Sequence, residues 1–221
     1  MALAAAASGS GRPAGARVPP GTRAILVNAS GVRTVEIQGA PGQLTIVGRS
    51  GSRVTLTGQL NWTGHAPAVA ARFDRASGIL HLTYRCAAAS PCTENYRLAV
   101  PRRTAVVLRQ PAGHVVISGL AGPLSITAAS VDVSGTALRC PSLLAVITSG
   151  HLNATFVAPP RRVAITLTSA QATLRLPATV RYAVSSAVTS GYLRLGIPHA
   201  SAATRTVTVR IDSGELELLP S

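Results

Sequence analysis

The second half of this 221-residue chain repeats a short turn of small residues about every twenty positions. The turns read Ala112-Gly113, Ser130-Val131, Ser149-Gly150, Ser169-Ala170, Ser190-Gly191 and Ser213-Gly214, with their second residues 18, 19, 20, 21 and 23 positions apart. A period of this length is typical of repeat proteins, in which each repeat is one supersecondary unit. Because one unit cannot bury its apolar face alone, the repeat predicts that neighbouring units stack on one another.

Around each turn, apolar residues recur at five positions that differ by two, which is the period of a β-strand. Counted from the second turn residue, these positions are −7, −5, −3, +2 and +4; one repeat has Leu143, Ala145, Ile147, Leu152 and Ala154 there. Positions +1 and +3 are largely polar. The pattern predicts an all-β, parallel β-helix or solenoid-like stack of coils, each with two short strands joined by a bend. An antiparallel sandwich has a similar strand spacing and is the alternative.

Glycine at a bend allows a positive φ or a close backbone approach. Val131 and Ala170 interrupt this glycine pattern, so we expect their corners to be built differently.

The first half of the chain lacks this strict repeat. Residues 1–21 contain mainly Ala, Gly, Ser, Pro and Arg and are predicted to be a flexible lead-in. Residues 22–100 are predicted to form irregular β coils that cap the array, with strands at 23–28, 34–38, 43–47, 53–60, 78–84 and 96–100 and a loop at 63–71. Residues 101–221 form the regular part, and we expect 22–221 to be one continuous domain.

The apolar stretch that begins at Ala2 is shorter than the roughly 20 residues a membrane-spanning helix needs. It also lacks the basic start of a secretory signal. Membrane tethering is expected only through a longer segment upstream.

Cys86 and Cys92 bracket a short loop, and a local disulfide there suits an oxidising, extracytoplasmic setting. Zinc is the alternative, although no matching His or Cys pair accompanies the two cysteines. Cys140 is expected to be a buried or corner residue without special chemistry.

The chain has 21 basic residues, all arginine, against 7 acidic ones, for a net charge of +14. The absence of lysine beside so much Ala and Gly indicates high-GC codon pressure, so the arginine count is partly genomic. The charge still favours anionic partners. Candidate anion contacts are the local groups Arg102-Arg103 with Arg109, and Arg161-Arg162. No basic and aromatic stripe of the kind that grips single strands is present, which argues against nucleic acid.

No catalytic motif stands out among the seven acidic residues. Glycoside hydrolysis needs a carboxylate pair, and the nearest group is Asp212, Glu215 and Glu217 at the last turn, where a solvated terminus is expected. A phosphate-binding glycine loop, a zinc-protease helix and a nucleophile elbow are all missing from the sequence. We therefore predict no enzyme activity and no cofactor.

One set of outward residues could hold a metal. His114, Asp132 and His151 all occupy position +1 of consecutive repeats, and stacked strands lie about 4.8 Å apart. Such a column could bind zinc, copper or nickel. In the alternative, it is a solvated ladder in which Asp132 offsets the surrounding positive charge.

Together, the Cys86 and Cys92 pair, the segment Tyr96-Arg97-Leu98-Ala99-Val100-Pro101 and the serial Ser-Gly turns resemble the bacterial putative-adhesin β-strand-repeat family, actinobacterial members above all. The resemblance covers about residues 25 to 219. It implies a right-handed β-solenoid outside the membrane, often behind an N-terminal membrane span that is incomplete here. It implies no established reaction.

From these observations we expect a non-catalytic, extracytoplasmic interaction module at the cell surface. Its partner would be a cell-surface or cell-wall polymer, anionic or carbohydrate, or another protein. Alternatives are a solenoid enzyme acting on polysaccharides and an intracellular scaffold. Free thiols at Cys86 and Cys92 would favour the scaffold.

Overall fold

The computed structural model describes residues 21–39, 42–86 and 92–221, and these residues form thirteen strands and no helix. The first seven strands are β1 (Gly21–Ser30), β2 (Thr34–Gln38), β3 (Gly42–Arg49), β4 (Arg53–Trp62), β5 (Ala68–Asp74), β6 (Ile79–Arg85) and β7 (Cys92–Pro101). The other six are β8 (Ala105–Ser118), β9 (Leu124–Leu138), β10 (Ser142–Phe156), β11 (Arg162–Leu176), β12 (Ala183–Leu195) and β13 (Thr206–Pro220). All belong to one mixed sheet. The predicted lead-in, residues 1–21, lies outside the described residues apart from Gly21, which begins β1.

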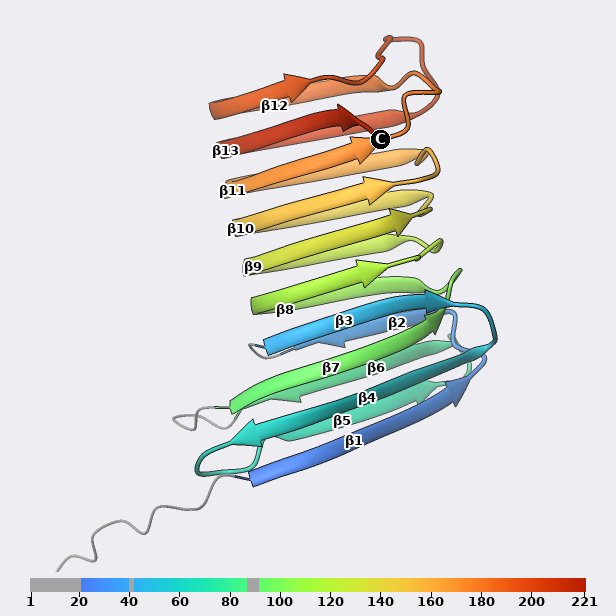
Figure 1. Cartoon of the computed structure of the whole chain (residues 1–221), viewed down its shortest axis with the longest axis vertical. Helices are drawn as coiled ribbons and strands as arrows, with labels where there is room; N and C mark the ends of the chain where they lie inside the picture. The colour runs from blue at the N-terminus through green and yellow to red at the C-terminus, as the bar shows by residue number, and fades with distance from the viewer. Residues whose placement is uncertain (1–20, 40–41, 87–91) are drawn as a thin grey trace, which may run out of the picture.

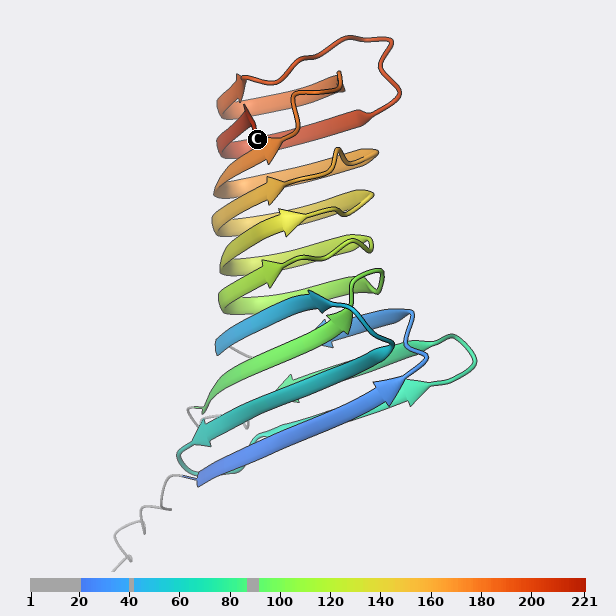
Figure 2. The same cartoon turned by 45° about the vertical axis from the view of Figure 1, so that its right-hand side comes forward.

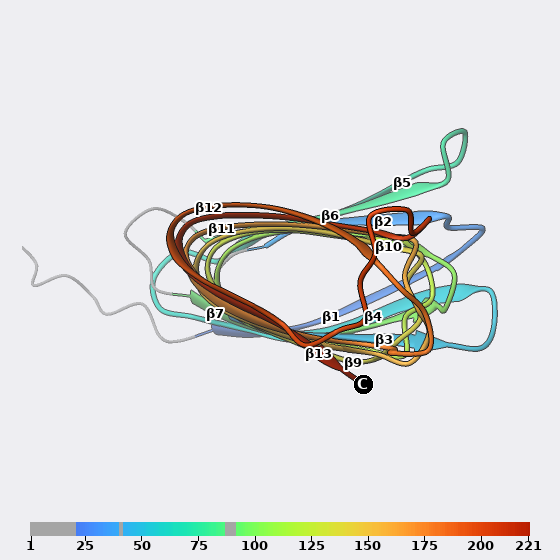
Figure 3. The ribbon, with the colours of Figure 1, turned by 90° about the horizontal axis from the view of Figure 1, so that it is seen from above.

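Each of the six long strands, β8 to β13, runs through a bend and continues on the opposite face, so that one strand forms most of one coil (Figures 1 and 2). Neighbouring coils are parallel and in register: Ser149 pairs with Ser130 on one side and with Ser169 on the other. Seen from above, the coils superimpose on a flattened ring with the bends on one side and the connecting loops on the other (Figure 3). The parallel pairing of these strands excludes the antiparallel sandwich.

The core lies between the two faces of the coils. In β10 the five positions predicted to point inward, Leu143, Ala145, Ile147, Leu152 and Ala154, are all at most 4% exposed. Small and medium aliphatic side chains of this kind fill a narrow space between two sheets without requiring aromatic rings. The alternation in the sequence therefore placed the core residues of β8 to β11 and of β13 correctly, whereas Val188 and Leu195 of β12 are 40% and 39% exposed.

From β8 to β11 the bends alternate between two constructions. Gly113 and Gly150 have φ of +116° and +102°, a region that favours glycine. A Cβ on Gly150 would overlap the carbonyl oxygen of Val131 in the coil before it. Val131 and Ala170 instead carry side chains that are buried in the core. The two corners without glycine are thus built differently, as expected.

The first half of the chain contributes two coils that are assembled from separate strands. β2 pairs with the first arm of β8, and β3 pairs with the second arm of the same strand. β6 and β7 then pair in parallel with β2 and β3. β4, β1 and β5 close this end by antiparallel pairing with β7, β4 and β6 respectively. The loop predicted at 63–71 is confirmed for residues 63–67 and wrong for 68–71, because β5 begins at Ala68. The short Ala-rich run of β5 shows no clear alternation.

The order of the coils in space differs from their order in the sequence at both ends. The β2–β3 coil lies between the β6–β7 coil and β8, and β13 lies between β11 and β12. At position −5, β13 has Val209, which is 1% exposed, whereas β12 has Ser186. A hydroxyl placed in an apolar core without a partner is destabilising. The more apolar strand therefore occupies the interior position, and β12 becomes the outermost coil.

The described residues contain no helix with the length and apolar character needed to span a bilayer.

Candidate functional site

The side chains at position +1 form one continuous row on the outside of the stack, immediately after the bends. Their spatial order is His114, Asp132, His151, Gln171, Glu215 and Tyr192, because β13 lies before β12. We call these six residues the outer polar row. With strands about 4.8 Å apart, the row extends over about 24 Å. It offers charged, amide and aromatic groups to a ligand lying along the stack.

The structure brings the three predicted metal-ligand candidates together at one end of this row. Nδ1 of His151 lies 2.7 Å from Oδ1 of Asp132, and Nδ1 of His114 lies 3.5 Å from Oδ2 of the same carboxylate. All three side chains are about half exposed or more. The hydrogen bond to His151, followed by the charges of both histidines, holds the pKa of Asp132 below its ordinary value.

This geometry is that of a ladder centred on Asp132, in which His151 is hydrogen-bonded to the carboxylate and His114 lies at ion-pair distance from it. Over residues 21–39, 42–86 and 92–221, no group of three or more His, Cys, Asp and Glu side chains is arranged to hold a metal ion. Binding of zinc, copper or nickel by these three residues stays a prediction.

A shallow groove of about 400 Å³ lies at the other end of the row. It is lined by Gln171, Glu215 and Tyr192 together with the bend residues of the same three coils, Ser169, Ser190 and Ser213. The Tyr192 ring is 56% exposed. An aromatic face beside hydroxyl, amide and carboxylate groups can stack on a polar ring and form hydrogen bonds with it.

Two of the three acidic residues near the last turn pair with arginines. Asp212 forms an ion pair with Nε of Arg210 at 3.4 Å, and Glu217 accepts a hydrogen bond from Nη1 of Arg194 at 3.3 Å. Glu215 belongs to the outer polar row. Two of the three carboxylates are thus neutralised by arginines at the surface.

The predicted group of Arg102, Arg103 and Arg109 is divided by the structure. Arg102 and Arg103 lie in the turn before β8, on the loop side of the stack, whereas Arg109 is four residues into β8, about 13 Å from its start. A third arginine joins the first two: the backbone N–H of Arg102 donates to the carbonyl oxygen of Arg49, at 3.0 Å. No pattern in the sequence links Arg49 to this group, because it is 53 positions away from Arg102.

Arg161 and Arg162 also gain a partner from a distant part of the chain. The N–H of Thr206 donates to the carbonyl oxygen of Arg161, so Arg205 lies in the neighbouring coil. The guanidinium of Arg205 donates to the carbonyl oxygens of Pro159 and Pro160, at 2.7 and 3.0 Å. We call Arg49, Arg102, Arg103, Arg161, Arg162 and Arg205 the edge arginines. Among the residues that the structure describes, the arginine ion pairs use Arg194 and Arg210 and none of these six.

A buried polar cluster lies beside the disulfide coil. Glu94 and Gln110 are each 3% exposed, and the rings of Tyr84 and Tyr96 stack with centroids 4.3 Å apart. Burial raises the pKa of both tyrosines, with Glu94 adding to the effect. The alternation of Glu94 with Tyr96 and Leu98 was the signal in the sequence that would have placed this carboxyl group inward.

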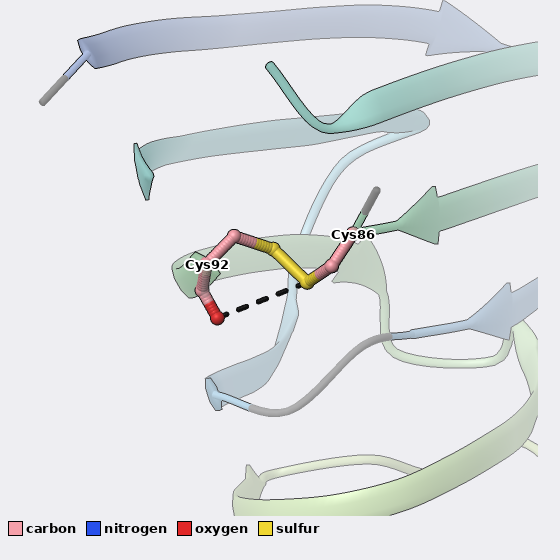
Figure 4. Close-up of a disulfide and its surroundings, with 2 residues drawn as sticks. All are labelled: Cys86 and Cys92. Carbon is pink, nitrogen blue, oxygen red and sulfur yellow. Dashed lines mark hydrogen bonds between the residues drawn. A yellow bond between two sulfur atoms is a disulfide. The ribbon is translucent and has the colours of Figure 1, made fainter. Parts of the chain in front are cut away.

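Cys86 and Cys92 form the predicted disulfide, with Cα atoms 5.8 Å apart (Figure 4). It links the end of β6 to the start of β7, at the bend side of their coil, and the loop between the cysteines lies outside the described residues. Cys140 is buried, as expected, and its thiol donates to the carbonyl oxygen of Leu120 at 3.6 Å.

Comparison with known proteins identifies similar folds but no sequence relative. No model of a known protein family matches the chain, and no curated protein sequence matches it. A crystal structure described as a putative cell adhesion protein of Clostridium sporogenes is similar over 92% of this chain and 100% of its own, with 12% identity and a TM-score of 0.52. A putative adhesin of Bacteroides fragilis follows, covering 89% of this chain and 97% of its own, with 10% identity and a TM-score of 0.47. At 12% identity, the likeness to the first concerns the fold alone.

Proposed function

We propose that this chain is a non-catalytic, extracytoplasmic contact module, and that its edge arginines bind an anionic polymer such as an acidic polysaccharide of the cell surface. One observation carries the proposal. The register of the coils gathers arginines from separate parts of the chain, Arg49 with Arg102 and Arg161 with Arg205, onto the loop side of the stack. These groups are free of ion pairs within the described residues.

The distribution of charge supports this assignment. Asp132 and Glu215 lie in the outer polar row, next to the bends, whereas the edge arginines lie at the connecting loops on the opposite side of the ring. The ion pairs of the described arginines use none of the edge arginines, and a surface with unpaired positive charge raises the local concentration of anionic ligands. Because these contacts are exposed, the affinity should fall steeply with ionic strength.

Several features accord with a module of this kind. The disulfide suits an oxidising compartment outside the cytoplasm. The parallel stacking of the coils supports a β-solenoid acting as one unit over residues 22–221. We propose that it is right-handed, as parallel crossover connections within a sheet almost always are. The pairing of Asp212 and Glu217 with arginines speaks against a carboxylate-based polysaccharide enzyme.

The test compares two double variants that each remove two positive charges. Arg161→Gln/Arg162→Gln changes the edge arginines, whereas Arg72→Gln/Arg75→Gln changes exposed arginines at the far end of the stack. Binding to immobilised alginate, with neutral dextran as the control polymer, is measured at 50 and 300 mM salt. We expect the first variant to bind alginate about tenfold more weakly and the second to stay within about twofold of the wild type.

Two results would contradict the proposal. One is alginate binding by the wild type that is absent or does not change with salt. The other is an equal loss in the two variants, which would mean that net charge alone decides binding.

A further inference from the structure

The outer polar row continues into the first half of the chain. Gln43 of β3 pairs with His114 of β8. Asn95 of β7 pairs with Gln43 in turn, and Gln59 of β4 pairs with Asn95. All three added side chains are exposed. We call the outer polar row together with Gln43, Asn95 and Gln59 the long polar row. It crosses strands of the front layer in Figure 1, from β4 to β12, over about 38 Å.

The twenty-residue repeat does not account for the composition of this row. Every member is an amide, a carboxylic acid, an imidazole or a phenol, and none is aliphatic or an arginine. The repeat requires only that these positions point outward, and the three residues from the first half lie outside the repeat. On the opposite outer face, Leu144 and Val146 of β10 are 48% and 36% exposed, and Arg109 and Arg210 lie in one row with Val146. The uniform polarity is therefore a property of one face and indicates a polar ligand.

The side chains of the row suit an uncharged ligand rich in hydroxyl groups. Within the part of the chain that the structure describes, the side chains of its three glutamines and its asparagine make no hydrogen bond to another residue. Each amide offers both donors and acceptors, as a pair of neighbouring sugar hydroxyls does. Asp132 and Glu215 repel an anionic polymer, and no arginine of the row attracts one. A neutral polysaccharide has the matching chemistry.

The geometry of the row suits an extended chain of sugars. The row presents one side chain from each strand, and neighbouring strands lie about 4.8 Å apart. One hexose of an extended β-1,4-linked glycan is about as long as this spacing, so that successive sugars can meet successive side chains. The groove of about 400 Å³ at the β12 end of the row contains Tyr192, whose ring is 56% exposed. An exposed aromatic ring can stack on the flat face of a sugar.

We propose that the long polar row binds an extended, neutral β-1,4-linked glycan that runs along the stack, with one sugar ring on Tyr192. The row lies beside the bends, whereas the edge arginines lie at the connecting loops on the other side of the ring (Figure 3). The glycan site is thus separate from the anion site and does not depend on it.

The experiment measures binding of two neutral β-1,4-linked hexasaccharides, cellohexaose and chitohexaose, to the full chain by calorimetry. Maltohexaose is the control ligand, because it has the six glucose units of cellohexaose in a curved α-linked chain. At least one β-linked hexasaccharide should bind, and its affinity should not change with salt. Gln171→Ala/Tyr192→Ala and Gln43→Ala/Asn95→Ala alter the two ends of the row, and each should weaken binding about tenfold through lost hydrogen bonds and stacking.

The matched control is Gln38→Ala/Thr127→Ala, which removes an exposed amide and a hydroxyl from the opposite outer face. It should bind within about twofold of the wild type, since surface substitutions away from a site have small effects. Three results would overturn the proposal: no binding of either β-linked hexasaccharide at about 1 mM, equal binding of maltohexaose, or an equal loss in the row variants and the control. If a row variant does not fold, NMR of the wild type with the hexasaccharide decides. Shift changes confined to the long polar row support the site, and changes elsewhere contradict it.

The glycan site and the anion site can fail independently. Arg161→Gln/Arg162→Gln should leave hexasaccharide binding unchanged, and the row variants should leave alginate binding unchanged. A loss of hexasaccharide binding in the arginine variant would contradict the separate glycan site.

Discussion

Asp132 lies between two histidines of the neighbouring coils: it is hydrogen-bonded to Nδ1 of His151 at 2.7 Å, whereas Nδ1 of His114 is at the longer ion-pair distance of 3.5 Å. The hydrogen bond to His151 is the largest cause of the lowered pKa of Asp132. We therefore expect His151→Ala to raise this pKa toward 3.8 more than His114→Ala does. Carboxyl ¹³C shifts followed by NMR against pH measure both variants. An equal rise in the two would assign the effect to charge rather than to the hydrogen bond.

The same pair should make stability depend on acid pH. Because the folded pKa of Asp132 is lowered, its contribution is complete above the ordinary value of 3.8 and is lost as the pH falls through the folded value. Asp132→Asn should therefore lower the melting temperature at pH 5, and the difference from the wild type should shrink as the pH falls below 3.8. A difference that does not change with pH would show that the substitution acts through packing.

A zinc titration distinguishes the ladder from the metal site, because in the ladder no three ligands among the described residues converge on one point. If the ladder is correct, addition of Zn²⁺ leaves the melting temperature unchanged in the wild type and in His114→Ala alike. A rise in the wild type that His114→Ala abolishes would instead establish the metal site.

Gly113 and Gly51 have the same φ, +116°, but differ in their surroundings. A Cβ on Gly113 would overlap the carbonyl oxygen of Gly42, whereas a Cβ on Gly51 would meet no atom within 4 Å. Both Gly→Ala variants should lose about 1–3 kcal/mol through backbone strain. Gly113→Ala should lose about 1–3 kcal/mol more through the clash. Urea unfolding measures the difference, and equal losses would mean that the bend can open.

Because β13 lies inside the stack, a valine-to-serine substitution in β13 should destabilise the fold more than the same substitution on the outer face of β10. Val209, in β13, is 1% exposed, whereas Val146 on the outer face of β10 is 36% exposed. Val209→Ser should lower the free energy of unfolding by about 3 kcal/mol, because it removes packing and buries a hydroxyl. Val146→Ser should change it by less than about 0.5 kcal/mol. Similar losses in urea unfolding would argue against the interior place of β13.

The cysteines should react in a fixed order with iodoacetamide. Burial raises the pKa of the Cys140 thiol to about 12, so the native protein should incorporate no label. Unfolding without a reductant should expose one thiol, and unfolding with a reductant should expose three, which mass spectrometry counts. Labelling of Cys86 or Cys92 in the freshly isolated native protein would contradict the disulfide and favour an intracellular scaffold.

The sequence predicts which residues point into each coil far better than it predicts which coils lie next to one another. Alternation around a turn shows that Leu143 and Ile147 point inward, because strand geometry fixes the face of every second residue. The same pattern cannot show which coil lies above another, since any two coils with aliphatic columns can stack. Ser186 was the one local sign that β12 is poorly suited to an interior position.

For the candidate site, too, the sequence predicts contacts between consecutive coils but not contacts between distant parts of the chain. The row of His114, Asp132 and His151 follows from spacing alone, because those coils are consecutive in both sequence and space. Arg49 could not be joined to Arg102, since their contact depends on the insertion of β3 between β7 and β8. Long-range strand pairing of this kind is not encoded in any local pattern.

The interior place of β13 also bears on how the chain reaches its fold during synthesis. β12 leaves the ribosome first, and β13, which separates it from β11, follows. β12 therefore cannot take its final place until β13 has been synthesised. If β12 pairs with β11 earlier, β13 must displace it. The upper coils are thus completed in a single late step, and a chain captured before that step should be a preferred client of chaperones.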